Sequence, residues 1–182
     1  MKNLRLSLLL VLIGISCISA THTVKETVIY IVRHGEKDTT DAKNTDPELS
    51  AEGKERAQAL AKVLKREKLA AVYSTPYKRT QQTVVPCAQR NGIPLKTYGN
   101  KEVQNMVETI NSQFAHQKVL IAGHSNSVLE LIESFGGKRP VEKLNDDDYD
   151  FIFKLTLTKD GLVKVKTMRY GKTHHSTEVD LN

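Results

Sequence analysis

The sequence predicts an α/β fold, a three-layer α/β/α sandwich in which helices cover both faces of a mostly parallel central sheet. The main observation is that short apolar runs, rich in β-branched residues, alternate along the chain with segments whose apolar residues recur at helical spacing. Near the C-terminus, residues 151–158 and 162–170 instead alternate in polarity around Asp160-Gly161, which is typical of a β-hairpin. We expect this hairpin to add antiparallel strands at one edge of the sheet.

The elements before the hairpin are predicted from periodicity and from their boundary residues. Ser50 is expected to cap a helix in which Ala57, Leu60, Ala61 and Leu64 recur at helical spacing. Asn91-Gly92 and Gly136-Gly137 are expected to end two later helices. In chain order we expect a strand at 28–32, the helix after Ser50, a strand at 70–73, a helix at 77–90, a strand at 93–98, a helix at 103–114, a strand at 119–122 and a helix at 128–135.

Residues 1–20 have the pattern of a secretory signal peptide. Lys2 and Arg5 form a positive start, residues 6–15 are almost entirely apolar, and residues 16–20 are small or polar and offer a cleavage site. The apolar run is too short to cross a bilayer comfortably, which disfavours the alternative of an uncleaved membrane anchor. We therefore expect a secreted or periplasmic protein.

Cleavage after Ala20 would leave one domain, residues 21–182, with no stable membrane span. A lipid-modified Cys17 at the mature N-terminus is an alternative, although Gly14 occupies the position where a large aliphatic residue would favour lipidation. Cys87 would be the only cysteine of the mature chain, which excludes an internal disulfide framework.

The net charge is mildly basic. It is +6 for the whole chain and would be +4 without Lys2 and Arg5, the only charged residues among the first twenty. This charge suits an anionic ligand, but the lysines are scattered and no aromatic residues are interleaved with them. A nucleic-acid partner is therefore not expected.

Arginine and histidine side chains follow three of the predicted strands. Arg33-His34 comes after the first strand, the segment 74–79 with Arg79 after the second, and Gly123-His124 after the fourth. The carboxyl ends of neighbouring parallel strands open onto one crevice, so these segments are expected to meet if their strands are neighbours. Two arginines and two histidines suit a tetrahedral dianion, because a guanidinium binds phosphate oxygens bidentately and keeps its charge. A neutral imidazole in such a site can attack phosphorus, and the leaving alkoxide then needs an acid.

Four segments together resemble the histidine phosphatase superfamily, branch 1, of the phosphoglycerate mutase-like type. In order, the similar segments are Arg33-His34-Gly35-Glu36, Asp46-Pro47-Glu48-Leu49-Ser50-Ala51-Glu52-Gly53, Tyr73-Ser74-Thr75-Pro76-Tyr77-Lys78-Arg79-Thr80-Gln81-Gln82-Thr83 and Gly123-His124-Ser125-Asn126-Ser127. The resemblance covers residues 28–137 and implies the α/β/α sandwich of that family. It also implies that His34 is the nucleophile, that Arg33, Arg79 and His124 bind the phosphoryl group, and that neither a metal nor another cofactor is required.

The proton donor is the least defined part of this resemblance. Small relatives place an aspartate directly after the tyrosine that corresponds to Tyr98, but this chain has Gly99 there. Glu102 is the nearest carboxylate and is our candidate; alternatively, its charge only stabilises the first turn of the next helix. Glu36 is expected to orient His34 or its loop, or to be a solvated loop carboxylate. A phosphoramidate or an acyl phosphate substrate would need no strong acid.

The resemblance favours a phosphatase over a mutase, because the chain between Arg79 and His124 has no insertion that could form an enclosing lid. Together, the resemblance and the predicted signal peptide favour a small or glycan-borne phosphate ester of the cell envelope as the substrate. A protein phosphohistidine phosphatase and a catalytically weak phosphate-binding module are alternatives.

Two further patterns in the sequence have other interpretations. Ser125 lies in a segment one residue away from G-x-S-x-G, and Asp150 and His174 follow in the chain order of a serine hydrolase. That interpretation leaves the arginines without a role. The neighbouring His174 and His175 could bind a metal, but a closed set of ligands is not evident in the sequence.

Overall fold

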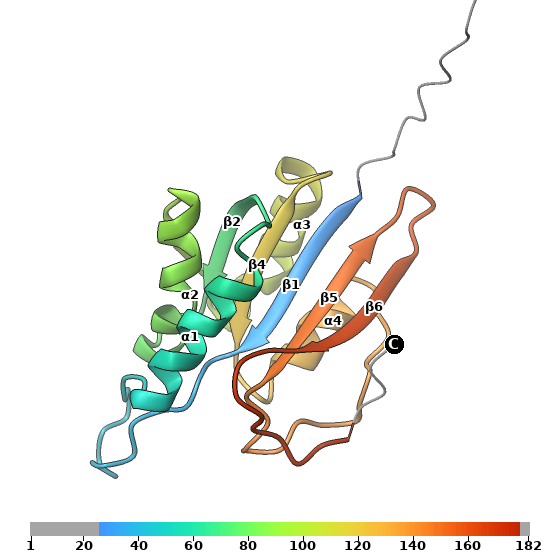
Figure 1. The fold of residues 1–182 in the computed structure, drawn as a ribbon. Helices are drawn as coiled ribbons and strands as arrows, with labels where there is room; N and C mark the ends of the chain where they lie inside the picture. Colours follow the sequence, from blue (N-terminus) through green and yellow to red (C-terminus); the bar gives the residue numbers. More distant parts are fainter. Residues whose placement is uncertain (1–25, 179–182) are drawn as a thin grey trace, which may run out of the picture.

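The computed structural model describes residues 26–178, and the predicted signal peptide and Cys17 lie outside this part of the chain. Six strands and four α-helices follow one another in a single α/β arrangement (Figure 1). The strands are β1 (Thr27–Arg33), β2 (Leu69–Ser74), β3 (Leu95–Thr97), β4 (Lys118–Gly123), β5 (Phe151–Leu157) and β6 (Val163–Arg169). The helices are α1 (Ala51–Val63), α2 (Lys78–Asn91), α3 (Val103–Gln113) and α4 (Val128–Ser134), with a short 3₁₀ turn, η1 (Asn100–Glu102), before α3.

The strands form one sheet in the order β3-β2-β4-β1-β5-β6. The first four of these strands are parallel, β5 runs antiparallel to β1, and β6 runs antiparallel to β5 at the edge. This confirms the mostly parallel sheet and the antiparallel hairpin at its edge. It also makes β2, β4 and β1 neighbours, so Arg33 lies opposite Gly123 and Ser74 lies opposite Ala122.

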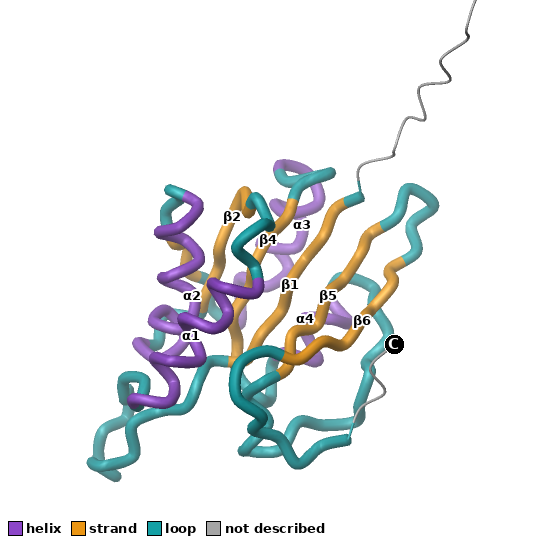
Figure 2. The backbone as a smooth tube through the Cα atoms, viewed as in Figure 1, coloured by secondary structure: helices purple, strands orange, loops and turns teal. Residues whose placement is uncertain are grey.

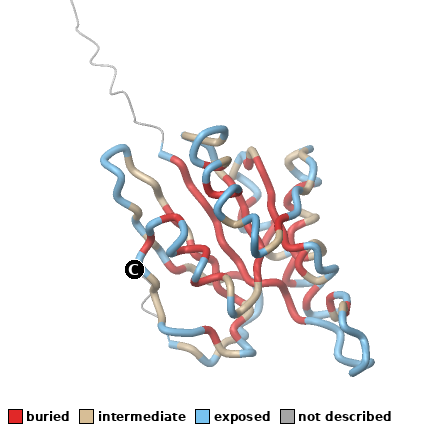
Figure 3. The backbone as a smooth tube through the Cα atoms, turned by 180° about the vertical axis from the view of Figure 1, so that it is seen from behind, coloured by how far each residue is buried: buried red, intermediate tan, exposed pale blue. Residues whose placement is uncertain are grey.

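Helices cover both faces of the sheet, as the alternating pattern predicts. On one face α1 and α2 pack against Val28, Tyr30 and Val32, and on the other face α3 and α4 pack against Ile29 and Ile31. Because consecutive side chains of a strand point to opposite faces, β1 contributes to both cores and is buried along its whole length (Figure 3).

Most element boundaries agree with the sequence. The Ser50 side chain accepts a hydrogen bond from the Gly53 amide, which confirms it as the cap of α1. The third strand is shorter than predicted: it begins after Pro94, which has no N–H to donate to a neighbouring strand, and ends at Thr97. Among the described residues, none of the helices is both long and apolar enough to cross a membrane.

Irregular segments gather at the carboxyl ends of β1 and β4 (Figure 2). They include residues 37–48 after β1, residues 136–150 after α4 and the segment that follows β6. The candidate site is therefore built at the edge of the sheet where parallel strands present the residues that follow them.

Candidate active site

The side chains singled out from the sequence line one cavity of about 810 Å³ at this edge of the sheet. Arg33 and His34 enter it from the end of β1, and His124 enters it from the end of β4; the His34 amide donates a hydrogen bond to the Gly123 carbonyl at 3.0 Å. Arg79 enters it from the first turn of α2, and Glu102 from the end of η1. The structure thus brings all five predicted site residues to one place.

His34 is held in one tautomer. Its Nδ1 lies 2.7 Å from the Gly35 carbonyl oxygen, and because a carbonyl only accepts hydrogen bonds, Nδ1 carries the proton and Nε2 keeps its lone pair. The side chain is buried beside the His124 ring, with 5.3 Å between the ring centroids. Burial, and then the nearby positive charge of Arg33 and Arg79, lowers the pKa of His34 to about 3. The imidazole is therefore neutral near pH 7, as a nucleophile must be.

The backbone around His34 is fixed by two neighbouring elements. The Gly35 amide donates to the Thr83 hydroxyl at 2.8 Å, and that hydroxyl donates to the Arg79 carbonyl at 2.8 Å, so the β1 loop is tied to the turn that carries Arg79. On the other side, Gly53 of α1 lies directly against the loop. A Cβ atom at Gly53 would lie only 2.2 Å from the Glu36 carbonyl oxygen, so any larger residue would push the loop away.

Both arginines offer buried donors to an anion. The Arg33 guanidinium lies 4.1 Å from the centre of the Tyr149 ring, and the Arg79 guanidinium lies 4.7 Å from that of the Tyr77 ring. Within residues 26–178, the Nε atoms of Arg33 and Arg79 are buried and have no hydrogen-bond partner. Since an unpaired buried donor is costly, these atoms are suited to a ligand with acceptor oxygens.

His124 is also positioned by hydrogen bonds. Its Nε2 lies 2.9 Å from the Thr75 hydroxyl, and its backbone amide donates to the Ser127 hydroxyl at 3.0 Å. Burial, followed by the charges of Arg79 and Arg33, lowers the pKa of His124 to about 4. Like His34, it is a neutral imidazole in the absence of an anion.

We expect these two lowered histidine pKa values to reduce stability in acid. In the unfolded chain a histidine has a pKa of 6.5, so below that pH the unfolded state binds protons that folded His34 and His124 do not take up. The free energy of unfolding should therefore fall as the pH is lowered from about 7 to 4.5, and urea unfolding at both pH values measures the fall. This fall in the free energy of unfolding should be smaller in the variant His34→Asn, which lacks one of the two histidines. An equal fall in the variant would contradict the lowered pKa of His34.

The two candidate carboxylates have different surroundings. Glu102 is exposed and lines the cavity, and its Oε2 accepts a hydrogen bond from the Gly99 amide at 2.6 Å. Glu36 does not line the cavity; it is buried, and its carboxylate pairs with Arg56 at 2.6–2.9 Å. Burial alone would raise the pKa of Glu36, but the hydrogen bonds from Arg56 hold it below the usual value. The alternative of a solvated loop carboxylate at Glu36 is therefore wrong.

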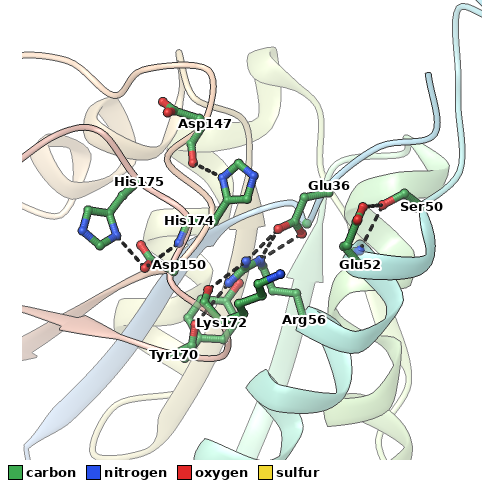
Figure 4. A network of polar contacts seen from close by, with 12 residues as sticks. Glu36, Ser50, Glu52, Arg56, Asp147, Asp150, Tyr170, Lys172, His174 and His175 are labelled. Carbon is green, nitrogen blue, oxygen red and sulfur yellow. Dashed lines mark hydrogen bonds and ion pairs between the residues drawn. The ribbon is translucent and has the colours of Figure 1, made fainter.

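The serine hydrolase arrangement is not assembled. Ser125 lines the cavity, but the Nδ1 of His174 bonds to the Asp147 carbonyl and not to the Asp150 carboxylate. Asp150 instead accepts hydrogen bonds from the His174 amide and from His175 (Figure 4). Within residues 26–178, no group of three or more histidine, cysteine, aspartate or glutamate side chains is placed to hold a metal ion, the pair His174 and His175 included.

Sequence reasoning missed several residues that position the site. Two residues of the segment 145–150, Asn145 and Tyr149, pack against Arg33. Thr75 forms a hydrogen bond with His124. Residues 145–150 have no periodic pattern. Nothing in their sequence, which includes three consecutive aspartates, indicates that Asn145 contacts Arg33, 112 positions earlier in the chain. Thr75 directly follows β2, just as His34 follows β1 and His124 follows β4, and that position was the signal available for it.

Known proteins resemble this chain in part of its sequence and in its fold. The family model of the histidine phosphatase superfamily (branch 1) matches residues 29–102. Phosphoserine phosphatase 1 of Hydrogenobacter thermophilus is 36% identical over 69 residues, which are 36% of this chain and 33% of that protein. The chain thus aligns with about a third of the length of this curated relative.

Several solved proteins have the same fold. The protein histidine phosphatase SixA, solved with tungstate, has a TM-score of 0.63 at 18% identity and covers 78% of this chain and 96% of its own. The mycobacterial glucosyl-3-phosphoglycerate phosphatase has a TM-score of 0.63 at 12% identity, over 80% of this chain and all of its own. YhfR of Bacillus stearothermophilus has a TM-score of 0.60 at 17% identity, over 76% and 95%. Residues 29–102 therefore match the model of the histidine phosphatase superfamily, branch 1, and the chain has the fold that these solved proteins share.

Proposed function

We propose that this chain is a metal-independent phosphatase that hydrolyses phosphate monoesters through a phosphohistidine at His34. The observation that carries the proposal is the state of His34. It is a buried, neutral imidazole with a free Nε2, in a cavity where Arg33 and Arg79 each have a buried, unpaired Nε donor. This arrangement supplies a nucleophile and an oxyanion-binding frame at the same point.

In the first step the ester binds with its phosphoryl oxygens on Arg33, Arg79 and His124. The Nε2 lone pair of His34 attacks phosphorus opposite the leaving oxygen; a P–N bond forms, the P–O bond to the alcohol breaks, and the alkoxide takes a proton from an acid. The positive charge that the imidazole gains is balanced by the phosphoryl group and stabilised by the hydrogen bond that Nδ1–H donates to the Gly35 carbonyl.

In the second step water attacks the phosphohistidine. The P–N bond breaks, inorganic phosphate leaves, and the electron pair returns to Nε2, so that His34 is neutral again. The carboxylate that gave its proton to the alcohol in the first step takes up the proton that the attacking water loses. The arginines stabilise the charge that develops on the phosphoryl oxygens in both steps and are not changed by the reaction.

The experiment that tests the proposal is rapid-quench labelling of the purified protein with a ³²P-labelled ester. We expect a transient, acid-labile and base-stable phosphate on His34 that forms and decays at rates compatible with turnover. Activity should persist in the presence of a chelator and be inhibited by vanadate. Tight binding of inorganic phosphate with no turnover on a broad panel of esters would instead support a phosphate-binding module.

We assign proton donation to Glu102, because it is the carboxylate on the cavity wall that follows β3. The variant Glu102→Gln keeps an oxygen that can accept the Gly99 hydrogen bond, so η1 should be preserved. For an alkyl phosphate, which needs an acid, kcat/KM should fall by about 10²-fold. For p-nitrophenyl phosphate, whose leaving group needs none, it should change little. An equal loss with both substrates would contradict a role as general acid.

We further propose that the mature protein, residues 21–182, acts in the cell envelope on a small or glycan-borne phosphate. The support is the pattern of residues 1–20 in the sequence and a cavity large enough for a phosphosugar. A screen of phosphosugars, phosphoproteins and acyl phosphates tests the substrate class. The mass of the native N-terminus distinguishes cleavage after Ala20 from lipidation at Cys17.

A further inference from the structure

The guanidinium of Arg33 is held by one short loop. Its Nη1 donates to the Asn145 carbonyl at 2.8 Å and lies 3.4 Å from the Asp148 carbonyl, while the Tyr149 ring covers the guanidinium at 4.1 Å. All three contacts come from residues 145–150, which we call the 145–150 loop. The orientation of the Arg33 guanidinium, which lines the cavity, therefore depends on the position of this loop.

The 145–150 loop has no strand or helix of its own to hold it. Its shape depends on Asp148, a residue that is only 1% exposed. Asp148 Oδ2 accepts hydrogen bonds from the Asn145 amide at 2.6 Å and from the Thr177 hydroxyl. Its Oδ1 accepts from the amides of Ser176 and Thr177, each at 3.0 Å. The Asp148 carboxylate thus holds the loop closed on Asn145 and joins it to a segment about thirty residues later in the chain.

That later segment, residues 170–178 after β6, is the C-terminal strap. It makes further bonds to the loop: the Asn145 side-chain amide donates to the hydroxyls of Ser176 and Thr177, and Ser176 donates to the Asp147 carboxylate at 2.7 Å. In addition, His174 bonds to the Asp147 carbonyl and His175 to the Asp150 carboxylate (Figure 4).

The other end of the strap is tied to the loop that carries the nucleophile. Arg56 of α1 donates to the carbonyls of Tyr170 and Lys172 at 3.2 and 3.0 Å. The same guanidinium pairs with Glu36, two residues after His34 (Figure 4). Gly171 lies between these two carbonyls with φ +70°, which lets the strap turn close to α1, where a Cβ would lie 3.3 Å from Arg56. The strap is therefore anchored on both sides of the site.

We propose that the C-terminal strap positions the active site through the 145–150 loop, and that Asp148, which joins this loop to the strap, is the central positioning residue. Through the 145–150 loop, Asp148 sets the direction of the Arg33 guanidinium and so the affinity for the phosphoryl group. This inference deepens the proposed function, on which it rests for the role of Arg33. Asp148 itself does not line the cavity and is not assigned any contact with the substrate.

The test is a double-mutant cycle between Asp148→Asn and Arg33→Ala, with vanadate binding measured by calorimetry on the full mature protein. With Arg33 present, Asp148→Asn should weaken vanadate binding by about ten-fold or more, because small misplacements of a positioning group cost up to about 10²-fold. In the Arg33→Ala background the same substitution should change binding by less than about two-fold, since there is no longer a guanidinium to position. Thr177→Val, a milder change, should show the same pattern with a smaller effect.

Asp160→Asn is the matched control. It removes the same charge in the exposed turn between β5 and β6 and should leave vanadate binding unchanged. Equal losses from Asp148→Asn with and without Arg33 would overturn the inference, because they would indicate a general structural effect. No loss from either Asp148→Asn or Thr177→Val would also overturn it. The binding readout does not depend on turnover, so a protein that binds vanadate but hydrolyses no ester would refute the proposed function and leave this test intact.

Discussion

His34→Asn is expected to abolish hydrolysis of phosphate monoesters while the protein remains folded. The substitution removes the Nε2 lone pair that forms the P–N bond in the proposed two-step route. Loss of a nucleophile typically lowers kcat by on the order of 10⁴-fold or more. Steady-state rates with p-nitrophenyl phosphate measure the loss, and the ³²P label should disappear from the quenched protein.

His116→Asn is the matched control for this substitution. His116 is exposed, lies outside the cavity and has a φ of +63°, a conformation that asparagine adopts readily. It should retain activity and the label. A protein that loses activity on Ser125→Ala or on reaction with an organophosphate, and keeps it in His34→Asn, would contradict the phosphohistidine route and support a serine nucleophile.

Arg56→Met is expected to cause a large loss of stability although Arg56 lies outside the cavity. Methionine keeps an apolar stem but leaves the carboxylate of Glu36, whose side chain is 10% exposed, without its partner. It also removes the bonds to the carbonyls of Tyr170 and Lys172. Breaking a buried ion pair by removing one partner costs about 3–5 kcal/mol. Urea unfolding at neutral pH measures the change in free energy of unfolding.

Two further variants define the origin of that loss. The double variant Glu36→Gln with Arg56→Met removes both charges and should recover part of the stability, because no uncompensated charge stays buried. Arg139→Met breaks the ion pair with Glu133, which is of the same type but more exposed, and should have little effect. If Arg56→Met were as mild as Arg139→Met, water would have to reach Glu36, contrary to its burial.

The sequence alone determined the elements and the candidate site residues. Periodicity is a local property: β-branched runs predicted the buried strands, and Ser50 marked the start of α1. Four site residues could be predicted because each lies at or near the end of a predicted strand or at the start of the helix that follows: Arg33, His34, Arg79 and His124. The carboxyl ends of neighbouring parallel strands must open at the same edge of the sheet. The structure places these residues in one cavity, and their chemical roles are proposals for the experiments above.

The tertiary structure alone decided how those side chains are held. The Nδ1 proton of His34 is assigned by its distance to the Gly35 carbonyl, and the orientation of Arg33 depends on residues more than a hundred positions away. Glu36 is paired with Arg56 instead of being solvated, and the C-terminal strap lies against the 145–150 loop. None of these contacts repeats along the chain or follows from the propensity of a segment. They form because the folded sheet brings irregular segments together at one edge, where each buried polar group must find a partner.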